Sequence, residues 1–124
     1  GNPHVIFFVP DCEAVELDRL GPLIEHDPLF PERINVNVCT ITDRRHIRLR
    51  VWERGAGLTL ACGTGMVACA LIYHELTGEP GPISVLVKGG DTLKVGFEEP
   101  HKSEYTNVTL FGPADFVFTG SVSI

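Results

Sequence analysis

The sequence has no long hydrophobic run and no excess of positive charge. Its longest uninterrupted apolar run, MVACALIY from Met66 to Tyr73, is far too short to cross a bilayer. No charged-then-apolar signal segment opens the chain, so we expect a cytoplasmic protein with no membrane partner. The formal net charge of -6 disfavours nucleic acid and anionic membranes, because both attract a basic surface. The same net charge is compatible with binding of small polar ligands.

The sequence also lacks paired cysteines. The four cysteines, at positions 12, 39, 62 and 69, form no CxxC pair and no dense framework. This pattern fits reduced thiols inside a cell better than the disulfides of a secreted domain. A zinc site of Cys62, Cys69 and His74 would lack the usual ligand pairs, so we expect no metal. Cys12, Cys39 and Cys69 are interpreted as inert thiols.

What the sequence has is enough apolar content for one domain. The chain has 124 residues, of which 44% are hydrophobic and 21% charged, so it can bury a sizeable core. No linker or internal repeat divides it, and we expect residues 1–124 to form a single domain. The opening GNPHVIFFV lacks an initiator methionine, so we expect the chain to come from a longer protein.

The first half of the chain predicts a strand, a helix and a hairpin. β-branched and aromatic residues at 4–9 indicate a buried strand. Apolar residues at helical spacing between 13 and 31 predict a short helix, interrupted by Gly21-Pro22. Residues 34–42 and 46–53 alternate with period two around the turn DRR, which predicts a hairpin with one solvated face.

The second half predicts one buried helix and four strands. Residues 66–76 are apolar almost all round, which indicates a helix buried on most sides, and Gly78 and Pro80 end it. Turns at Gly89-Gly90-Asp91 and Gly112-Pro113 each join two strands. We therefore expect an α+β fold with a mixed, largely antiparallel sheet wrapped around a central apolar helix.

Cys62 stands between a glycine-rich loop and the apolar helix. A buried structural cysteine needs no flanking glycines, whereas Gly63 and Gly65 allow something to approach the backbone. If the helix begins near Gly63, its N-terminal N–H groups and dipole favour a thiolate at Cys62 and an anionic ligand beside it. The sequence thus indicates that Cys62 acts as a base and that the N-terminus of the helix binds an anion. The alternative is that Cys62 is an ordinary cysteine packed in the core.

Other polar residues are candidates for ligand contacts. Glu53 and Arg54 follow a strand, and adjacent opposite charges near a presented cysteine suit a zwitterionic ligand. The alternative for this pair is a solvated strand end. Asn2 and His4 open the chain, where the alternative is a turn and a surface histidine.

Two asparagines share one face of a predicted strand. Asn35 and Asn37 alternate with apolar residues, so both side chains point to the same side of the sheet. They are either polar sheet residues or ligand donors, and their spacing does not choose between these roles.

Four motifs, in order, resemble the C-terminal half of diaminopimelate epimerase. They are GNPH at 1–4, FPERIN at 30–35, RLRVWERGAG at 48–57 and ACGTG at 61–65. The similarity runs on through GPADFVFTG near the end of the chain. ACGTG alone would be a weak signal, but four motifs in the right order and spacing are highly specific.

The resemblance implies one lobe of the diaminopimelate epimerase-like fold, with the N-terminal lobe absent from this chain. Enzymes of that family use no cofactor and interconvert LL- and meso-diaminopimelate in lysine and peptidoglycan precursor biosynthesis. One cysteine from each lobe faces the substrate's α-carbon, so that one removes the proton and the other returns it. The resemblance further implies a homodimer of the full-length enzyme.

The resemblance also implies roles for individual residues. Cys62, His4 and Glu53 would be catalytic, with His4 and Glu53 tuning the thiols. The substrate contacts would be Asn2, Asn35, Glu53, Arg54 and the amides of Gly63 and Thr64, which would hold the reacting carboxylate.

Two departures and three alternatives accompany this interpretation. Leu58 stands where the family usually has a glutamate, and Met66-Val67 stands where the helix start is usually richer in alanine. One alternative is another member of the superfamily, a proline racemase or isomerase-like protein. The others are a cysteine-nucleophile hydrolase that uses Cys62 with His4 as base, and a non-catalytic binding fragment.

Overall fold

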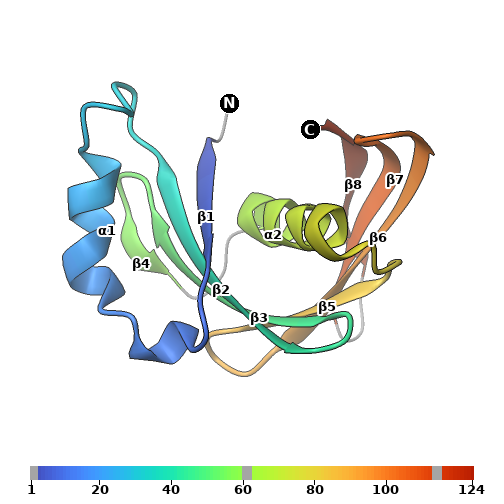
Figure 1. Cartoon of the computed structure of the whole chain (residues 1–124), viewed down its shortest axis with the longest axis horizontal. Helices are drawn as coiled ribbons and strands as arrows, with labels where there is room; N and C mark the ends of the chain where they lie inside the picture. The colour runs from blue at the N-terminus through green and yellow to red at the C-terminus, as the bar shows by residue number, and fades with distance from the viewer. Residues whose placement is uncertain (1–2, 60–62, 113–115) are drawn as a thin grey trace.

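The computed structural model describes residues 3–59, 63–112 and 116–124, which form a sheet curled around one helix (Figure 1). The elements in chain order are β1 (His4–Phe8), the 3₁₀ helix η1 (Cys12–Ala14), α1 (Leu17–Glu25), β2 (Asn35–Asp43), β3 (His46–Glu53), β4 (Gly57–Thr59), α2 (Gly63–Thr77), β5 (Ile83–Val87), β6 (Thr92–His101), β7 (Glu104–Phe111) and β8 (Phe116–Ser123).

The eight strands form one mixed sheet with the order β1-β2-β3-β5-β6-β7-β8. β1 pairs with β2 and β3 pairs with β5 in parallel, while the other neighbours are antiparallel. β3 changes partner along its length, because 46–49 pair with β5 and 51–53 pair with β4. The sheet confirms the expected α+β class, although the short elements η1 and β4 were not predicted.

The main core surrounds α2, as the apolar sequence of this helix predicts. Two to three turns of the helix are buried from Gly65 to Tyr73 and pack against the concave side of the curled sheet (Figure 1). The Tyr73 hydroxyl accepts a hydrogen bond from the Arg45 N–H at 2.8 Å, which pairs a polar atom at the edge of this core. Within the described part of the chain, no helix is long and apolar enough to span a membrane.

A second core lies on the opposite face of the sheet, under η1 and α1. Val36 and Val38 of β2 pack there with Leu17 and Cys12. Arg50, expected on a solvated face of the hairpin, donates from Nη1 to the carbonyl oxygens of Cys12 and Val15 at 3.0 and 2.8 Å. The expectation of a solvated face is therefore wrong for this half of the sheet, because the β1–β2 crossover covers it.

Helix α1 runs without interruption through Gly21-Pro22, which corrects the expected break. Gly21 lies against the indole of Trp52, and a Cβ added at Gly21 would be 2.4 Å from Trp52 Cγ. Glycine is required here for close packing of helix on sheet. The helix ends at Glu25, whose carboxylate Oε1 accepts a hydrogen bond from Trp52 Nε1 at 2.8 Å.

His74, in the last turn of α2, holds a positive charge between two acceptors. Its Nδ1 lies 2.7 Å from the Glu79 carbonyl oxygen and its Nε2 lies 2.9 Å from the Glu99 carboxylate. Since both partners only accept, both ring nitrogens carry hydrogen. Burial lowers the pKa of His74, but the Glu79 carbonyl and the Glu99 carboxylate outweigh it, so that the pKa is raised. A cation also suits the C-terminal end of a helix.

Replacing Gly21 with alanine should destabilise the fold. The added methyl group overlaps the Trp52 ring, and overpacking of this kind costs about 1 to 3 kcal/mol, more than alanine gains in helix propensity. Urea unfolding measures the loss. In a Trp52→Leu background the same change should cost less, and an equal cost in both backgrounds would contradict the proposed overlap.

His74→Gln should destabilise the protein most at acidic pH. The pKa of His74 is higher in the folded than in the unfolded state, so the protonated imidazole stabilises the fold. This stabilisation is complete at pH values below the unfolded-state pKa and is lost as the pH rises through the folded-state pKa. The difference in unfolding free energy between wild type and variant, about 1.5 to 3 kcal/mol near pH 6, should therefore shrink as pH rises. Exposed His101→Gln is the control, and a difference that grows with pH would contradict the assignment.

Candidate active site

The predicted site residues that the structure describes meet where one end of the sheet approaches the first turn of α2. β1 and β2 begin at this end, and the antiparallel β3 finishes there. Strand alternation places Asn35 and Asn37 on the α2 side of β2, opposite the face that carries Val36 and Val38. Figure 1 shows the beginning of α2, in green, next to β1.

His4 joins the first strand to the start of α2. Its Nε2 lies 3.1 Å from Thr64 Oγ1, and its Nδ1 lies 3.0 Å from Asn37 Nδ2. Burial lowers the pKa of His4, while the negative charge of Glu53 opposes this shift; the net pKa is lowered. His4 is therefore a neutral imidazole at neutral pH, with partners at both ring nitrogens.

Asn35 ties the beginning of β1 to the end of β3. Its side-chain Nδ2 and its backbone N–H both donate to the Pro3 carbonyl oxygen at 3.0 Å. Its Oδ1 accepts the Arg54 backbone N–H at 2.7 Å. The Asn35 amide thus holds the two chain segments that carry His4 and Arg54 in a fixed relation, whatever further contact it makes with a ligand.

The turn after β3 positions Glu53 and Arg54. Ala56 N–H donates to the Glu53 carbonyl at 3.0 Å, and Gly55 occupies the left-handed region at φ 77°. Arg54 Nη1 donates to the Glu32 carbonyl oxygen at 3.3 Å. The turn therefore packs against the segment between α1 and β2, and the Glu53 charge lies close enough to affect His4.

Glu25 supports this turn and was missed by sequence reasoning. The residue is 3% exposed, and its carboxylate accepts hydrogen bonds from Trp52 Nε1 and, at 3.2 Å, from the Gly55 N–H. These hydrogen bonds lower the pKa of Glu25, with that of Trp52 the strongest; burial opposes them. Arg33 Nη1 lies 3.7 Å from the same carboxylate. The signal was available, because Glu25 continues the buried i, i+4 positions of Leu17 and Gly21.

Cys62 and Asn2, which the sequence singles out, lie outside the described residues. Gly63, which follows Cys62 in the sequence, is the first residue of α2, and this confirms the expected helix start. N–H groups in the first turn of an α-helix have no acceptor within the helix, so such a turn favours an anion. Gly63 and Thr64 are exposed.

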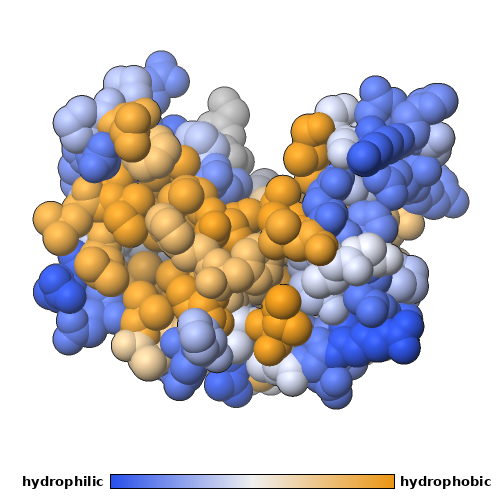
Figure 2. Space-filling model, viewed as in Figure 1, coloured by the Kyte–Doolittle hydropathy of each residue, from blue (hydrophilic) through white to orange (hydrophobic). Residues whose placement is uncertain are grey.

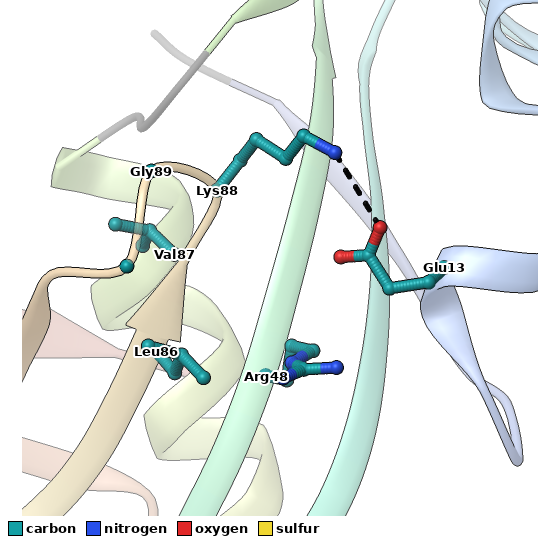
Figure 3. Close-up of a pocket in the computed structure, with 7 residues that line it drawn as sticks. Glu13, Arg48, Leu86, Val87, Lys88 and Gly89 are labelled. Atoms are coloured by element: carbon teal, nitrogen blue, oxygen red, sulfur yellow. Dashed lines mark ion pairs between the residues drawn. The ribbon is translucent and has the colours of Figure 1, made fainter.

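A cavity of about 300 Å³ lies between the segment that carries Glu13 and the turn at Gly89-Gly90 (Figure 3). In it, Lys88 Nζ lies 3.6 Å from Glu13 Oε2, and the Gly89-Gly90 turn forms part of the wall. The remaining lining residues are Arg48, Leu86 and Val87. None of the described candidate site residues lines this cavity. Among the residues that the structure describes, no three histidine, cysteine or acidic side chains are placed to hold a metal ion.

The surface is hollowed at the top of the view in Figure 2, between the side that carries β1 and the side that carries β8. Apolar residues dominate the left and centre of this view, and hydrophilic residues cover the ends of β6 and β7. The beginning of β1 borders the hollow.

The fold and this arrangement define an α+β domain that holds polar residues against the start of a buried helix. The same fold occurs in the crystal structure of the Bacillus anthracis phenazine biosynthesis protein of the PhzF family, with a TM-score of 0.59 and 18% sequence identity. The match covers 89% of this chain and 34% of that chain, and it shows the fold alone.

The sequence profile of diaminopimelate epimerase matches residues 1–117, and the chain belongs to this family. It is 51% identical over 125 residues to the diaminopimelate epimerase of Rhizorhabdus wittichii, covering 100% of this chain and 43% of that protein. It is 55% identical over 121 residues to that of Sphingopyxis alaskensis, covering 97% of this chain and 42% of that protein. The chain thus spans about two fifths of the length of these relatives.

Cys62 should be the most reactive of the four thiols. Cys12, Cys39 and Cys69 are fully buried, and burial raises the pKa of the Cys12 thiol, so these three should alkylate slowly. Iodoacetamide labelling at neutral pH, with mass-spectrometric assignment of the modified peptide, measures the order of reaction. The fast phase should disappear in Cys62→Ser and persist in Cys69→Ser. Faster labelling of Cys12 or Cys39 in the folded chain would contradict the prediction.

Proposed function

We propose that this chain is the C-terminal lobe of a cofactor-independent epimerase that interconverts LL- and meso-diaminopimelate in the cytoplasm. Cys62 is the acid or base on one side of the α-carbon. A second cysteine, from an N-terminal lobe that this chain does not contain, acts on the other side. The complete enzyme is a homodimer. In this proposal the isolated lobe provides half of the active site and has no turnover of its own.

The observation that carries the proposal is the hydrogen bond between His4 and Thr64. It brings the start of β1, with Asn35 and the Glu53–Arg54 turn attached, to the helix end that follows Cys62 in the sequence. Residues from four motifs of the family therefore converge on one helix N-terminus. This convergence supports the assignment of Asn35, Glu53 and Arg54 as substrate contacts, and the same role is proposed for Asn2 from its place in the first motif alone.

The chemistry needs such an environment. The α-proton of an amino acid is weakly acidic, and without a cofactor the developing carbanion must be stabilised by its surroundings. N–H groups of Gly63 and Thr64 at the start of α2 would hold the reacting carboxylate, and His4 and Glu53 would tune the thiols. Two bases on opposite faces accept both stereoisomers without either base crossing the substrate.

A cysteine hydrolase that uses Cys62 and His4 is less well supported. Its base must take a proton from the thiol, which requires an accepting ring nitrogen directed at sulfur. In the described structure His4 Nδ1 faces Asn37 and Nε2 faces Thr64. A proline racemase-like enzyme differs in its substrate, since it would not need Arg54 and the asparagines to bind a distal amino-carboxylate.

The test is to join this chain to the N-terminal lobe of the Sphingopyxis alaskensis relative and to measure epimerisation of diaminopimelate in deuterium oxide. The fusion should exchange the substrate α-hydrogen, whereas the 124-residue chain alone should not. Cys62→Ser should lower the rate of exchange by about 10²-fold to 10⁴-fold, because one proton-transfer group is lost.

Cys69→Ser is the matched control and should keep most of the activity, since Cys69 is a core residue of α2. Turnover by the isolated chain would contradict the assignment of one cysteine to each lobe. An acyl-enzyme trapped on Cys62 would favour the hydrolase instead.

A further inference from the structure

Asn37 is a buried polar residue that no role described so far explains. It lies in β2 opposite Ile6 of β1 and is 0% exposed. Its Nδ2 contacts two atoms of the neighbouring strand, the Val5 carbonyl oxygen at 3.2 Å and His4 Nδ1 at 3.0 Å. Its Oδ1 is buried and has no hydrogen-bond partner among the described residues. Burying an unpaired amide oxygen costs free energy, so Asn37 is a poor choice for stability alone.

The Val5 carbonyl fixes the orientation of the Asn37 amide. A carbonyl oxygen only accepts, so the amide atom that faces it is the nitrogen and not the oxygen. The same nitrogen faces His4 Nδ1. One N–H of the Asn37 amide therefore points to Val5 and the other to the imidazole, and the second contact is an N–H···N hydrogen bond with His4 Nδ1 as the acceptor.

We infer that Asn37 is a positioning residue that holds His4 as the tautomer with its hydrogen on Nε2. A neutral imidazole that accepts at Nδ1 must carry its proton at Nε2. Nε2–H then donates to Thr64 Oγ1, 3.1 Å away. The hydrogen bonds therefore run in one direction, from the Asn37 amide through His4 to the hydroxyl at the start of α2.

The direction of this chain matters for Thr64. Because its Oγ1 accepts from His4, the Thr64 O–H proton points away from the imidazole. In the opposite tautomer, the hydroxyl would donate its hydrogen bond to His4. Through His4, Asn37 thus determines whether the Thr64 hydroxyl, in the first turn of α2, accepts or donates the hydrogen bond at the imidazole.

The inference deepens the proposed function, because it assigns Asn37 to the acid–base site of the epimerase. The tautomer itself is independent of any substrate. A spectroscopic test in the absence of diaminopimelate therefore separates the two ideas. A failed epimerase assay would not contradict the expected tautomer, and finding the other tautomer would not contradict the epimerase proposal.

The experiment is nitrogen NMR of the uniformly ¹⁵N-labelled chain at about pH 8, where an ordinary histidine is neutral. His4 should show a protonated Nε2 and an unprotonated Nδ1. A scalar coupling through the N–H···N hydrogen bond should link Asn37 Nδ2 to His4 Nδ1. Asn35 is the internal control for the coupling, since its Nδ2 donates to an oxygen.

His46 is the internal control for the tautomer. Its Nδ1 lies 2.7 Å from the Arg44 carbonyl oxygen, so it must carry its hydrogen on Nδ1, the opposite of His4. Its signals should be the same in every variant that folds.

Two variants test control by Asn37. In Asn37→Asp, a carboxylate replaces the donor, and His4 should become protonated on Nδ1. In Asn37→Leu, which has a similar shape and removes the unpaired oxygen, the coupling should vanish and the Nδ1 resonance should shift.

A wild-type His4 with its proton on Nδ1 would overturn the inference, and so would an Asn37→Asp variant that folds and keeps the original tautomer. If Asn37→Asp does not fold, Asn37→Leu decides, because an unchanged Nδ1 resonance in that variant would also overturn it.

Discussion

Burial of an almost wholly apolar helix is the constraint on which the rest of the structure depends. From Gly65 to Tyr73, α2 has no continuous polar face that could be exposed to water. A flat sheet would cover only one side of such a helix, so the sheet curls, and β2, β3, β5, β6 and β7 contribute buried residues to the core around it. The order of the strands follows from this need, with β3 and β5 placed side by side beneath the crossover that carries α2.

The two ends of α2 are therefore the places where the helix meets polar surroundings. At its C-terminal end, His74 is fixed between the Glu79 carbonyl and the Glu99 carboxylate. At its N-terminal end, Gly63 and Thr64 are exposed, and His4 is the contact from the sheet. The C-terminal end is occupied by the ion pair of His74 and Glu99, which stabilises the fold, while the N-terminal end is exposed to solvent. This asymmetry explains why the residues expected to do chemistry gather at the start of the helix.

The candidate site depends on supports that do not resemble catalytic residues. Asn35 connects the segments of His4 and Arg54 through backbone atoms, and Glu25 connects α1 to the turn after β3. Of the predicted residues, the structure brings together His4, Asn35, Glu53, Arg54 and Thr64, while their roles toward a substrate stay predictions. Cys62 and Asn2 lie outside the described residues. The sequence placed Asn37 beside Asn35 on one face of a strand and Glu25 on the buried face of a helix, but the partners that give these polar groups a role are seen only when their neighbours are known.

The sequence by itself determined the α+β class, the central apolar helix and most of the strands, because hydrophobic periodicity is a local property that each segment carries. It also determined the family, through motifs whose order and spacing are written along the chain. Only the tertiary structure decided that α1 passes through Pro22, that the second face of the sheet is buried, and that Asn37 rather than solvent faces His4. These features depend on contacts between segments tens of residues apart, such as Gly21 with Trp52, and no local pattern encodes such a pairing.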